Sequence, residues 1–168
     1  QYEQAARTAE RMGAAVETTG ASEMADVSFT ANQADRCFHC KGHLLEELNR
    51  VAKHRGYDAV LVGANVDDEA DYRPGHKAIA KYGAKTPLRD AGFTKEDIRK
   101  LSRELGLATA DMPATPCLAS RFQYGLEITN ERLKQVEQAE EFLRQFGLVE
   151  FRVRHHGELA RIEVHPED

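Results

Sequence analysis

The chain has 168 residues, of which 41% are hydrophobic and 30% are charged, and its formal net charge is −5. This length suits one domain, or one domain and part of a second, with enough apolar residues for a core. The negative balance argues against a protein that coats nucleic acid, although a local arginine cluster can still bind phosphate. No apolar run approaches roughly 20 residues, so we expect neither a membrane span nor a secretory signal. With only three cysteines, the sequence predicts a protein of the reducing cytoplasm.

The first part of the chain alternates helical and extended patterns. Residues 2–12 have a helical composition that ends at Gly13, and residues 14–19 have the pattern of a short strand. A polar loop is expected over 22–35, before a helix that begins near the Cys-Phe-His-Cys segment and ends at Gly56. A helix followed at once by a strand is the order of an α/β fold.

A nearly continuous apolar run follows at 58–63. It predicts a strand buried on both faces of a parallel sheet. The next segment, 64–75, then lies at the carboxyl end of that strand, where open α/β sheets bind ligands. We expect a short helix over 76–82, a last short strand over 85–88, and a further helix after the capping box that begins at Thr94.

Two prolines between residues 109 and 120 predict a loop, and we place a domain boundary there. The expected domains are therefore 1–112 and 113–168. In the second, Thr129 is the expected N-cap of a long helix. That helix carries three glutamates that the local pattern does not distinguish, since a charged helix face is usually solvated. These glutamates are Glu137, Glu140 and Glu141.

The two strands expected over 149–154 and 159–164 form a hairpin. Their apolar side chains would face the core, namely Val149, Phe151, Val153, Ala160, Ile162 and Val164. Their polar side chains would then gather on the opposite face, namely Arg152, Arg154, Arg161 and Glu163. Three guanidinium groups suit an anion such as phosphate. Ordinary cross-strand ion pairing explains the same alternation, and the pattern does not decide between them.

The three cysteines are the most informative side chains. Cys37 and Cys40 form a C-x2-C pair near a helix start, and Cys117 lies in the later proline-containing loop. Three thiolates cannot close a tetrahedral zinc site without a fourth ligand, for which His39 and His43 are candidates. A dithiol redox site also uses such a pair at a helix start. Three thiolates can instead hold a [4Fe–4S] cluster and leave its fourth iron open. The residues alone leave these readings open.

The loop after the predicted strand at 58–63 is the other candidate site. Asn65, Asp67 and Asp68 follow Gly63 closely, and a small residue there lets the backbone approach a ligand. Their side chains suit a hydroxyl group, a metal ion or an amine. A solvated acidic loop with turn-forming residues is the alternative interpretation.

Several segments together resemble the LarE family of ATP-dependent pyridinium-carboxylate sulfur transferases, which belongs to the PP-loop ATP pyrophosphatase superfamily. The matching segments are 35–41, 63–68, 71–75, 87–88, 91–92, 98–99, 103–107, 117–121, 124–125, 136–140 and 153–157. The resemblance implies a Rossmann-like α/β fold with a parallel PP-loop sheet, followed by part of a smaller α+β domain for sulfur transfer. It also implies that ATP with Mg²⁺ adenylylates a pyridinium carboxylate mononucleotide, after which sulfur replaces the activated oxygen. This reaction belongs to nickel-pincer nucleotide cofactor biosynthesis for lactate racemase.

The resemblance also assigns roles to residues. It implies that Cys37, Cys40 and Cys117 hold a [4Fe–4S] cluster that a sulfide source replenishes, or that Cys117 is itself the sacrificial sulfur donor. Three residues match positions of the transfer chemistry, namely Cys117, Arg121 and Glu140. Three match the substrate-phosphate region, namely Arg152, Arg154 and Glu163. The loop with Asn65, Asp67 and Asp68 matches the nucleotide side.

One departure concerns the pyrophosphate-binding Ser-Gly-Gly-x-Asp-Ser loop, which in this family would precede Gln1. We therefore expect this chain to be a fragment that binds ATP weakly by itself, and we expect the protein to form a homo-oligomer. A tRNA-thiolating PP-loop enzyme is one alternative, which the acidic balance disfavours. A zinc-stabilised binding domain is the other.

Overall fold

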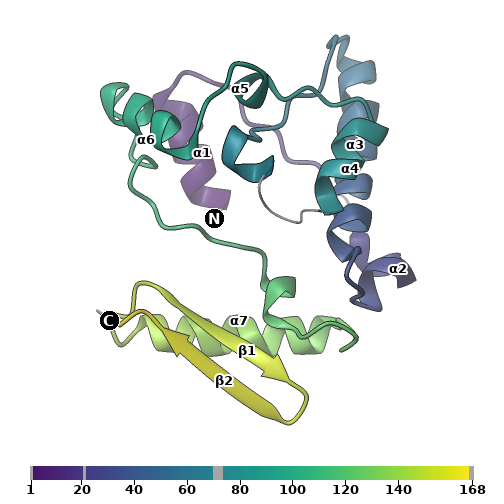
Figure 1. Ribbon diagram of the computed structural model, residues 1–168, viewed down its shortest axis with the longest axis vertical. Helices are drawn as coiled ribbons and strands as arrows, with labels where there is room; N and C mark the ends of the chain where they lie inside the picture. The colour runs from purple at the N-terminus through teal and green to yellow at the C-terminus, as the bar shows by residue number, and fades with distance from the viewer. Residues whose placement is uncertain (1, 21, 70–73, 167–168) are drawn as a thin grey trace. The chain divides into compact units, whose positions relative to one another are not determined.

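The computed structural model describes residues 2–20, 22–69 and 74–166 (Figure 1). The chain forms two compact units. The first comprises residues 1–21 and 42–112, and the second comprises residues 22–41 and 113–168. The second unit is not continuous in sequence, because the segment 22–41 groups with the residues after 112. The division into domains 1–112 and 113–168 stays a prediction. None of the described helices has the length and apolarity needed to cross a membrane.

The first unit is mostly helical. Its helices are α1 (Tyr2–Arg11), most of α3 (Arg36–Arg55), the 3₁₀ turn η2 (Val66–Glu69), α4 (Pro74–Lys81), α5 (Pro87–Asp90) and α6 (Lys95–Glu104). The predicted capping box is confirmed at the start of α6. Thr94 Oγ1 accepts a hydrogen bond from the Asp97 backbone N at 3.1 Å, and the Asp97 carboxylate accepts one from the Thr94 N at 3.0 Å. Gly13 and Gly106, with φ near 66°, follow α1 and α6 because a left-handed residue ends a helix.

The strands predicted in this unit are only partly present. Residues 14–19 are not a strand; their side chains are exposed and no ladder holds them. The run at 58–63 makes one parallel bridge, Leu61 to Lys85, in which the Val62 N donates to the Lys85 carbonyl at 2.8 Å. Its burial on both faces was predicted wrongly, since Leu61 is 62% exposed. Beyond Lys85, Pro87 begins α5, because its fixed φ suits the first position of a helix. Within the described ranges the one regular sheet is the antiparallel pair in the second unit.

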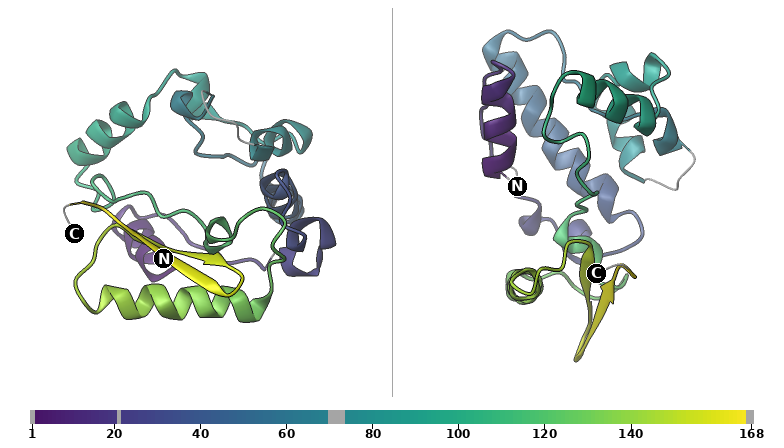
Figure 2. Two further views of the ribbon diagram at one scale, coloured as in Figure 1. Left: turned by 60° about the horizontal axis from the view of Figure 1, so that its bottom comes forward. Right: turned by 90° about the vertical axis from the view of Figure 1, so that its left-hand side faces the viewer.

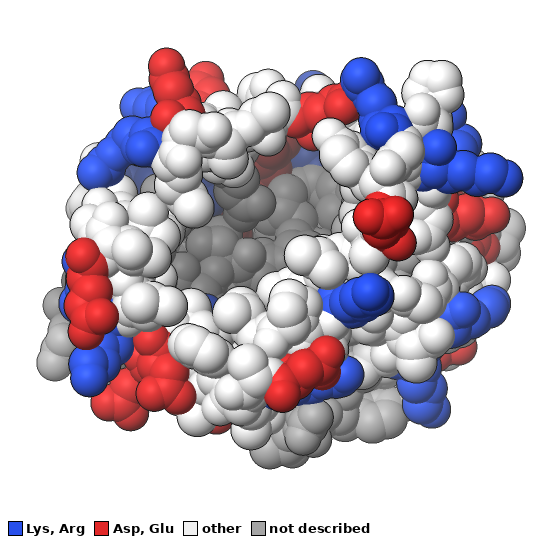
Figure 3. Space-filling model, turned by 90° about the horizontal axis from the view of Figure 1, so that it is seen from above, with Lys and Arg blue, Asp and Glu red and all other residues white. Residues whose placement is uncertain are grey.

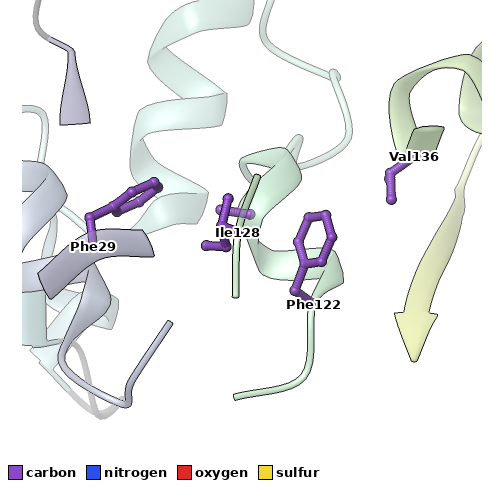
Figure 4. Packing of buried hydrophobic residues seen from close by; sticks show 5 residues of the cluster. Phe29, Phe122, Ile128 and Val136 are labelled. Carbon is purple, nitrogen blue, oxygen red and sulfur yellow. The ribbon is translucent and has the colours of Figure 1, made fainter. Parts of the chain in front are cut away.

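The second unit is built around a small apolar core. Its elements are η1 (Glu23–Ala25), α2 (Val27–Thr30), the first turns of α3, η3 (Leu118–Arg121), α7 (Asn130–Arg144), β1 (Phe151–His156) and β2 (Leu159–Val164). The segment predicted as a polar loop thus contains two short helices, because Asp26 caps α2 by accepting from the Ser28 N at 2.8 Å. The core residues are Phe29, Ala119, Phe122, Ile128 and Val136 (Figure 4). Burial of Phe29 in this core joins the segment 22–41 to the residues after 113.

The hairpin has the predicted pairing, and β1 packs along α7 (Figure 2). Its register sets Arg152 opposite Glu163 and Arg154 opposite Arg161, so the four polar residues do share one face. On the other face Val153 is buried at 4% exposure, as predicted. Burial of the β2 side chains was predicted wrongly, since Ile162 is 53% exposed. In a two-stranded sheet β2 is an edge, and α7 covers β1.

Candidate functional site

All three cysteines belong to the second unit and are free thiols. Cys37 and Cys40 lie three residues apart in the first turns of α3, which places them on one face of the helix. Cys40 packs against the apolar core, and Cys117 directly precedes η3. Burial raises the pKa of the Cys40 thiol to about 11, and Glu23, Cys117 and Cys37 contribute further. The fold therefore brings the Cys40 thiol within electrostatic reach of the Cys37 and Cys117 thiols.

The arrangement differs from that of a single bound ion. No three His, Cys, Asp or Glu side chains of the described residues converge as ligands of one metal ion.

His39, one of the candidate fourth ligands, is engaged elsewhere. Its Nε2 lies 3.3 Å from Asp35 Oδ2, and its Nδ1 lies 3.9 Å from Asp26 Oδ2. On a helix it is rotated by about 200° from Cys37, away from the face that the two cysteines share. The raised thiol pKa disfavours Cys40 as the attacking thiol of a dithiol redox site.

Arg121 and Glu140 form a buried pair beside Cys117, at 4% and 2% exposure. The guanidinium donates to both carboxylate oxygens, from Nε at 2.8 Å and from Nη2 at 3.1 Å. Its Nη1 donates to the carbonyls of Pro116 at 3.0 Å and Cys117 at 3.3 Å. Glu140 also accepts from the Val153 N at 3.1 Å. The pair therefore ties the backbone that carries Cys117 to α7 and β1.

The hairpin arginines differ in their availability. Arg154 donates to Glu163 from Nε at 2.8 Å and to the Ser120 carbonyl from Nη1 at 2.9 Å. Arg161 donates to the other Glu163 oxygen at 2.6 Å. These hydrogen bonds lower the pKa of Glu163, and the bond from Arg154 has the largest effect. Cross-strand ion pairing is thus present. The side chain of Arg152 has no hydrogen bond or ion pair among the described residues, and it lines a shallow hollow of about 230 Å³.

The predicted nucleotide loop lies in the first unit. The three residues bond to the loop itself and to the start of α6. Asn65 Oδ1 accepts from the Asp67 N at 3.0 Å, and Asp68 Oδ2 accepts from the Asn65 N at 3.0 Å. Asp67 Oδ2 accepts from the Lys95 N at 2.6 Å, which caps α6. Of the nearby motif 71–75, residues 71–73 lie outside the described part of the chain.

Charges of both signs are mixed on the surface. On the face shown in Figure 3, Lys and Arg side chains alternate with Asp and Glu side chains instead of gathering by sign. A tract of uniform positive charge is the footprint of a nucleic-acid-binding surface. The face shown lacks that footprint among the described residues.

Comparison with known proteins gives three relatives and no matching family model. The chain is 38% identical, over 98% of its length and 59% of the relative's, to the pyridinium-3,5-bisthiocarboxylic acid mononucleotide synthase of Lactiplantibacillus plantarum. The similarity to that synthase therefore extends over nearly the whole chain. An uncharacterized Synechocystis protein is 44% identical over 99% of the chain and 62% of its own length. An uncharacterized Methanocaldococcus jannaschii protein is 36% identical over 79% of the chain and 52% of its own length. The chain thus spans less than two thirds of the length of each.

Two buried polar residues of the second unit have no clear signal in the sequence. Asn32 is fully buried and has φ 53°, and Arg36 is 5% exposed. Both precede Cys37 closely. Asn is one of the few residues that adopt a left-handed conformation readily, and this tendency was the one local signal available. Nothing in the local pattern indicates that Arg36 is buried.

Proposed function

We propose that the protein is an ATP-dependent sulfur transferase acting on a pyridinium carboxylate mononucleotide, in the biosynthesis of the nickel-pincer nucleotide cofactor. The similarity to the Lactiplantibacillus synthase over nearly the whole chain carries this proposal. The grouping of Cys37, Cys40 and Cys117 in one compact unit supports it, because sulfur transfer needs thiol chemistry at one place.

The proposed reaction has two steps. A substrate carboxylate oxygen attacks the α-phosphorus of ATP with Mg²⁺, pyrophosphate leaves, and an acyl adenylate forms. A sulfur nucleophile then attacks the activated carbonyl carbon, and AMP leaves with the former carboxylate oxygen. Arg152 is the guanidinium that we assign to the substrate phosphate, because it is the hairpin arginine without a partner among the described residues. Arg154 and Glu163 orient the strand face on which it lies.

We assign the three cysteines to a [4Fe–4S] cluster. When bound, such a cluster would supply the sulfur atom at the iron that carries no cysteine. Ligation would require loss of the Cys40 proton, which the pKa of about 11 opposes in the metal-free protein. Arg121 and Glu140 hold the backbone of Cys117, and we propose that they contribute to the transfer chemistry beside it.

A sacrificial Cys117 is the second route to sulfur, favoured by the exposure of its thiol. Its sulfur would attack the acyl adenylate and form a thioester. Loss of the Cα proton and cleavage of the Cβ–S bond would then release the thiocarboxylate and leave dehydroalanine at 117. This route consumes one protein molecule for each sulfur.

We also propose that the parallel bridge between Leu61 and Lys85 belongs to a PP-loop sheet, whose ATP site includes Asn65, Asp67 and Asp68. We propose that the protein acts in the cytoplasm, since free cysteines persist in a reducing compartment. We also propose that it forms a homo-oligomer.

Anaerobic reconstitution of the complete protein with iron and sulfide tests the proposal. We expect about four irons for each chain and a broad absorption near ~400 nm, lost in Cys40→Ser and kept in Arg50→Gln, an exposed control on the same helix. The substrate, ATP and sulfide should then yield a thiocarboxylate product. If the protein holds no iron and carries dehydroalanine at 117 after turnover, the sacrificial route is correct and the cluster assignment is wrong. One zinc ion and no thiocarboxylate product would overturn the proposal in favour of a binding domain.

A further inference from the structure

Asn32 lies between the two cysteine-bearing segments and bonds to both. Its side-chain Nδ2 donates to the carbonyls of Gln123 and Leu126, each at 2.8 Å. Its Oδ1 accepts from Arg36 Nη1 at 2.5 Å. Its own carbonyl accepts from the Gly125 N at 2.9 Å. The side chain is 0% exposed, so its amide is fully committed to these partners.

Arg36 completes the connection from the first turn of α3. Its Nη1 donates to the Ala119 carbonyl at 2.8 Å, across 83 positions of sequence, and its guanidinium lies 5.7 Å from the centre of the Tyr124 ring. Arg36 directly precedes Cys37, and Ala119 lies two residues after Cys117. The hydrogen bond therefore joins the immediate neighbours of two of the three thiols.

The burial of the Arg36 guanidinium is unusual for a residue that only stabilises the fold. Arg36 is 5% exposed, yet no carboxylate of the described residues pairs with it. A buried charge with neutral partners costs free energy that an apolar side chain of similar volume would avoid. A cluster of thiolates beside it would supply the missing negative charge. The position of Arg36 thus fits a role toward the thiols better than a role in stability alone.

We propose that Asn32 and Arg36 form a clamp, a pair of positioning residues that holds Cys37 and Cys40 near Cys117 before any metal or cluster binds. The clamp fixes two distant segments in advance, so the loop-closure entropy is lost during folding and not during cluster binding. The identity of the group that the thiols bind rests on the proposed function. The clamp itself concerns only the proximity of the thiols and does not rest on that function.

Cross-linking of the thiols in metal-free, reduced protein tests the clamp. A short fluorogenic reagent that alkylates two thiols is added, and peptide mapping gives the ratio of links to Cys117 over single alkylation. We expect this ratio to fall about tenfold in Arg36→Gln, which loses charge-assisted hydrogen bonds, and comparably in Asn32→Gly, which loses both amide donors and the acceptor for Arg36. Gly keeps the tolerance for a positive φ. Arg36→Lys should restore part of the ratio, because an ammonium still donates to the Ala119 carbonyl.

Two controls separate positioning from general stability. Arg50→Gln, on the same helix, should leave the ratio unchanged. Val153→Ala destabilises the second unit without touching the clamp and should change the ratio less than twofold while the unit stays folded. A fall in Val153→Ala as large as in Arg36→Gln, or an unchanged ratio in both clamp variants, would overturn the inference.

Iron binding distinguishes failure of the clamp from failure of the proposed function. If the natural protein takes up no iron but the cross-linking ratios behave as expected, the clamp stands and the cluster assignment fails. If the natural protein takes up iron and Arg36→Gln cross-links as the natural protein does, the clamp fails and the cluster assignment stands. If both hold, Arg36→Gln should also require more iron and sulfide to reach half occupancy.

Discussion

Replacing Glu140 by Gln should strongly destabilise the second unit. The carboxylate accepts three hydrogen bonds, two from Arg121 at 2.8 and 3.1 Å and one from the Val153 N at 3.1 Å. Both side chains of the pair are at most 5% exposed, so water screens neither charge. The amide keeps the volume, removes the negative charge, and turns an N–H group toward the guanidinium. Breaking one side of a buried pair costs about 3–5 kcal/mol, because the other charge stays buried without a partner.

The matched control is Glu141→Gln, one residue further along α7. Glu141 pairs with Arg144 at 2.8 Å, but the two side chains are 65% and 51% exposed. The pair should contribute less than about 0.5 kcal/mol. Native-state hydrogen exchange of peptides from α7 and β1, with increasing urea, measures the free energy of opening of this unit directly. A loss below about 1 kcal/mol in Glu140→Gln would show that the pair is solvated in solution, and the bracing of the Cys117 loop would then be refuted.

Three further predictions concern the same unit. In metal-free protein at pH 8, Cys40 should react with iodoacetamide about a hundredfold more slowly than a thiol with the ordinary pKa of 9.0. The reason is that a pKa of about 11 leaves about a hundredfold less thiolate at this pH. Equal alkylation rates in folded and urea-unfolded protein would contradict this prediction. The protonated thiol is the form that folding favours, so its stabilising contribution should be complete below pH 9 and be lost as the pH rises toward 11. Val153→Ala should cost about 2 kcal/mol because the side chain is buried against α7. Ile162→Ala should cost much less, because Ile162 pairs with Val153 on the same face but lies on the edge strand and is 53% exposed. Similar losses of urea stability in the two variants would contradict the edge position of β2.

Local chemistry in the sequence determined where most helices begin and end. The capping box at Thr94 and the N-cap at Thr129 formed as predicted, because each uses hydrogen bonds within four residues of the cap. Strand alternation also placed Arg152, Arg154 and Glu163 on one face, since the period of two leaves no choice once the strands pair. The identity of the three cysteines as candidate ligands came from residue type and spacing alone.

Contacts between distant segments were decided by the tertiary structure. Sequence periodicity did not distinguish Glu140 from Glu137 and Glu141, and the packing of α7 against β1 buried Glu140 alone of the three. The extended segments at 14–19 and 58–63 have strand composition, but a strand needs neighbours, and composition does not supply them. The pairing of Arg36 with Ala119 joins residues 83 positions apart, and no local pattern specifies such a contact. The sequence by itself therefore determined which side chains have thiol and anion-binding chemistry, while burial and long-range hydrogen bonding decided which of them lie together.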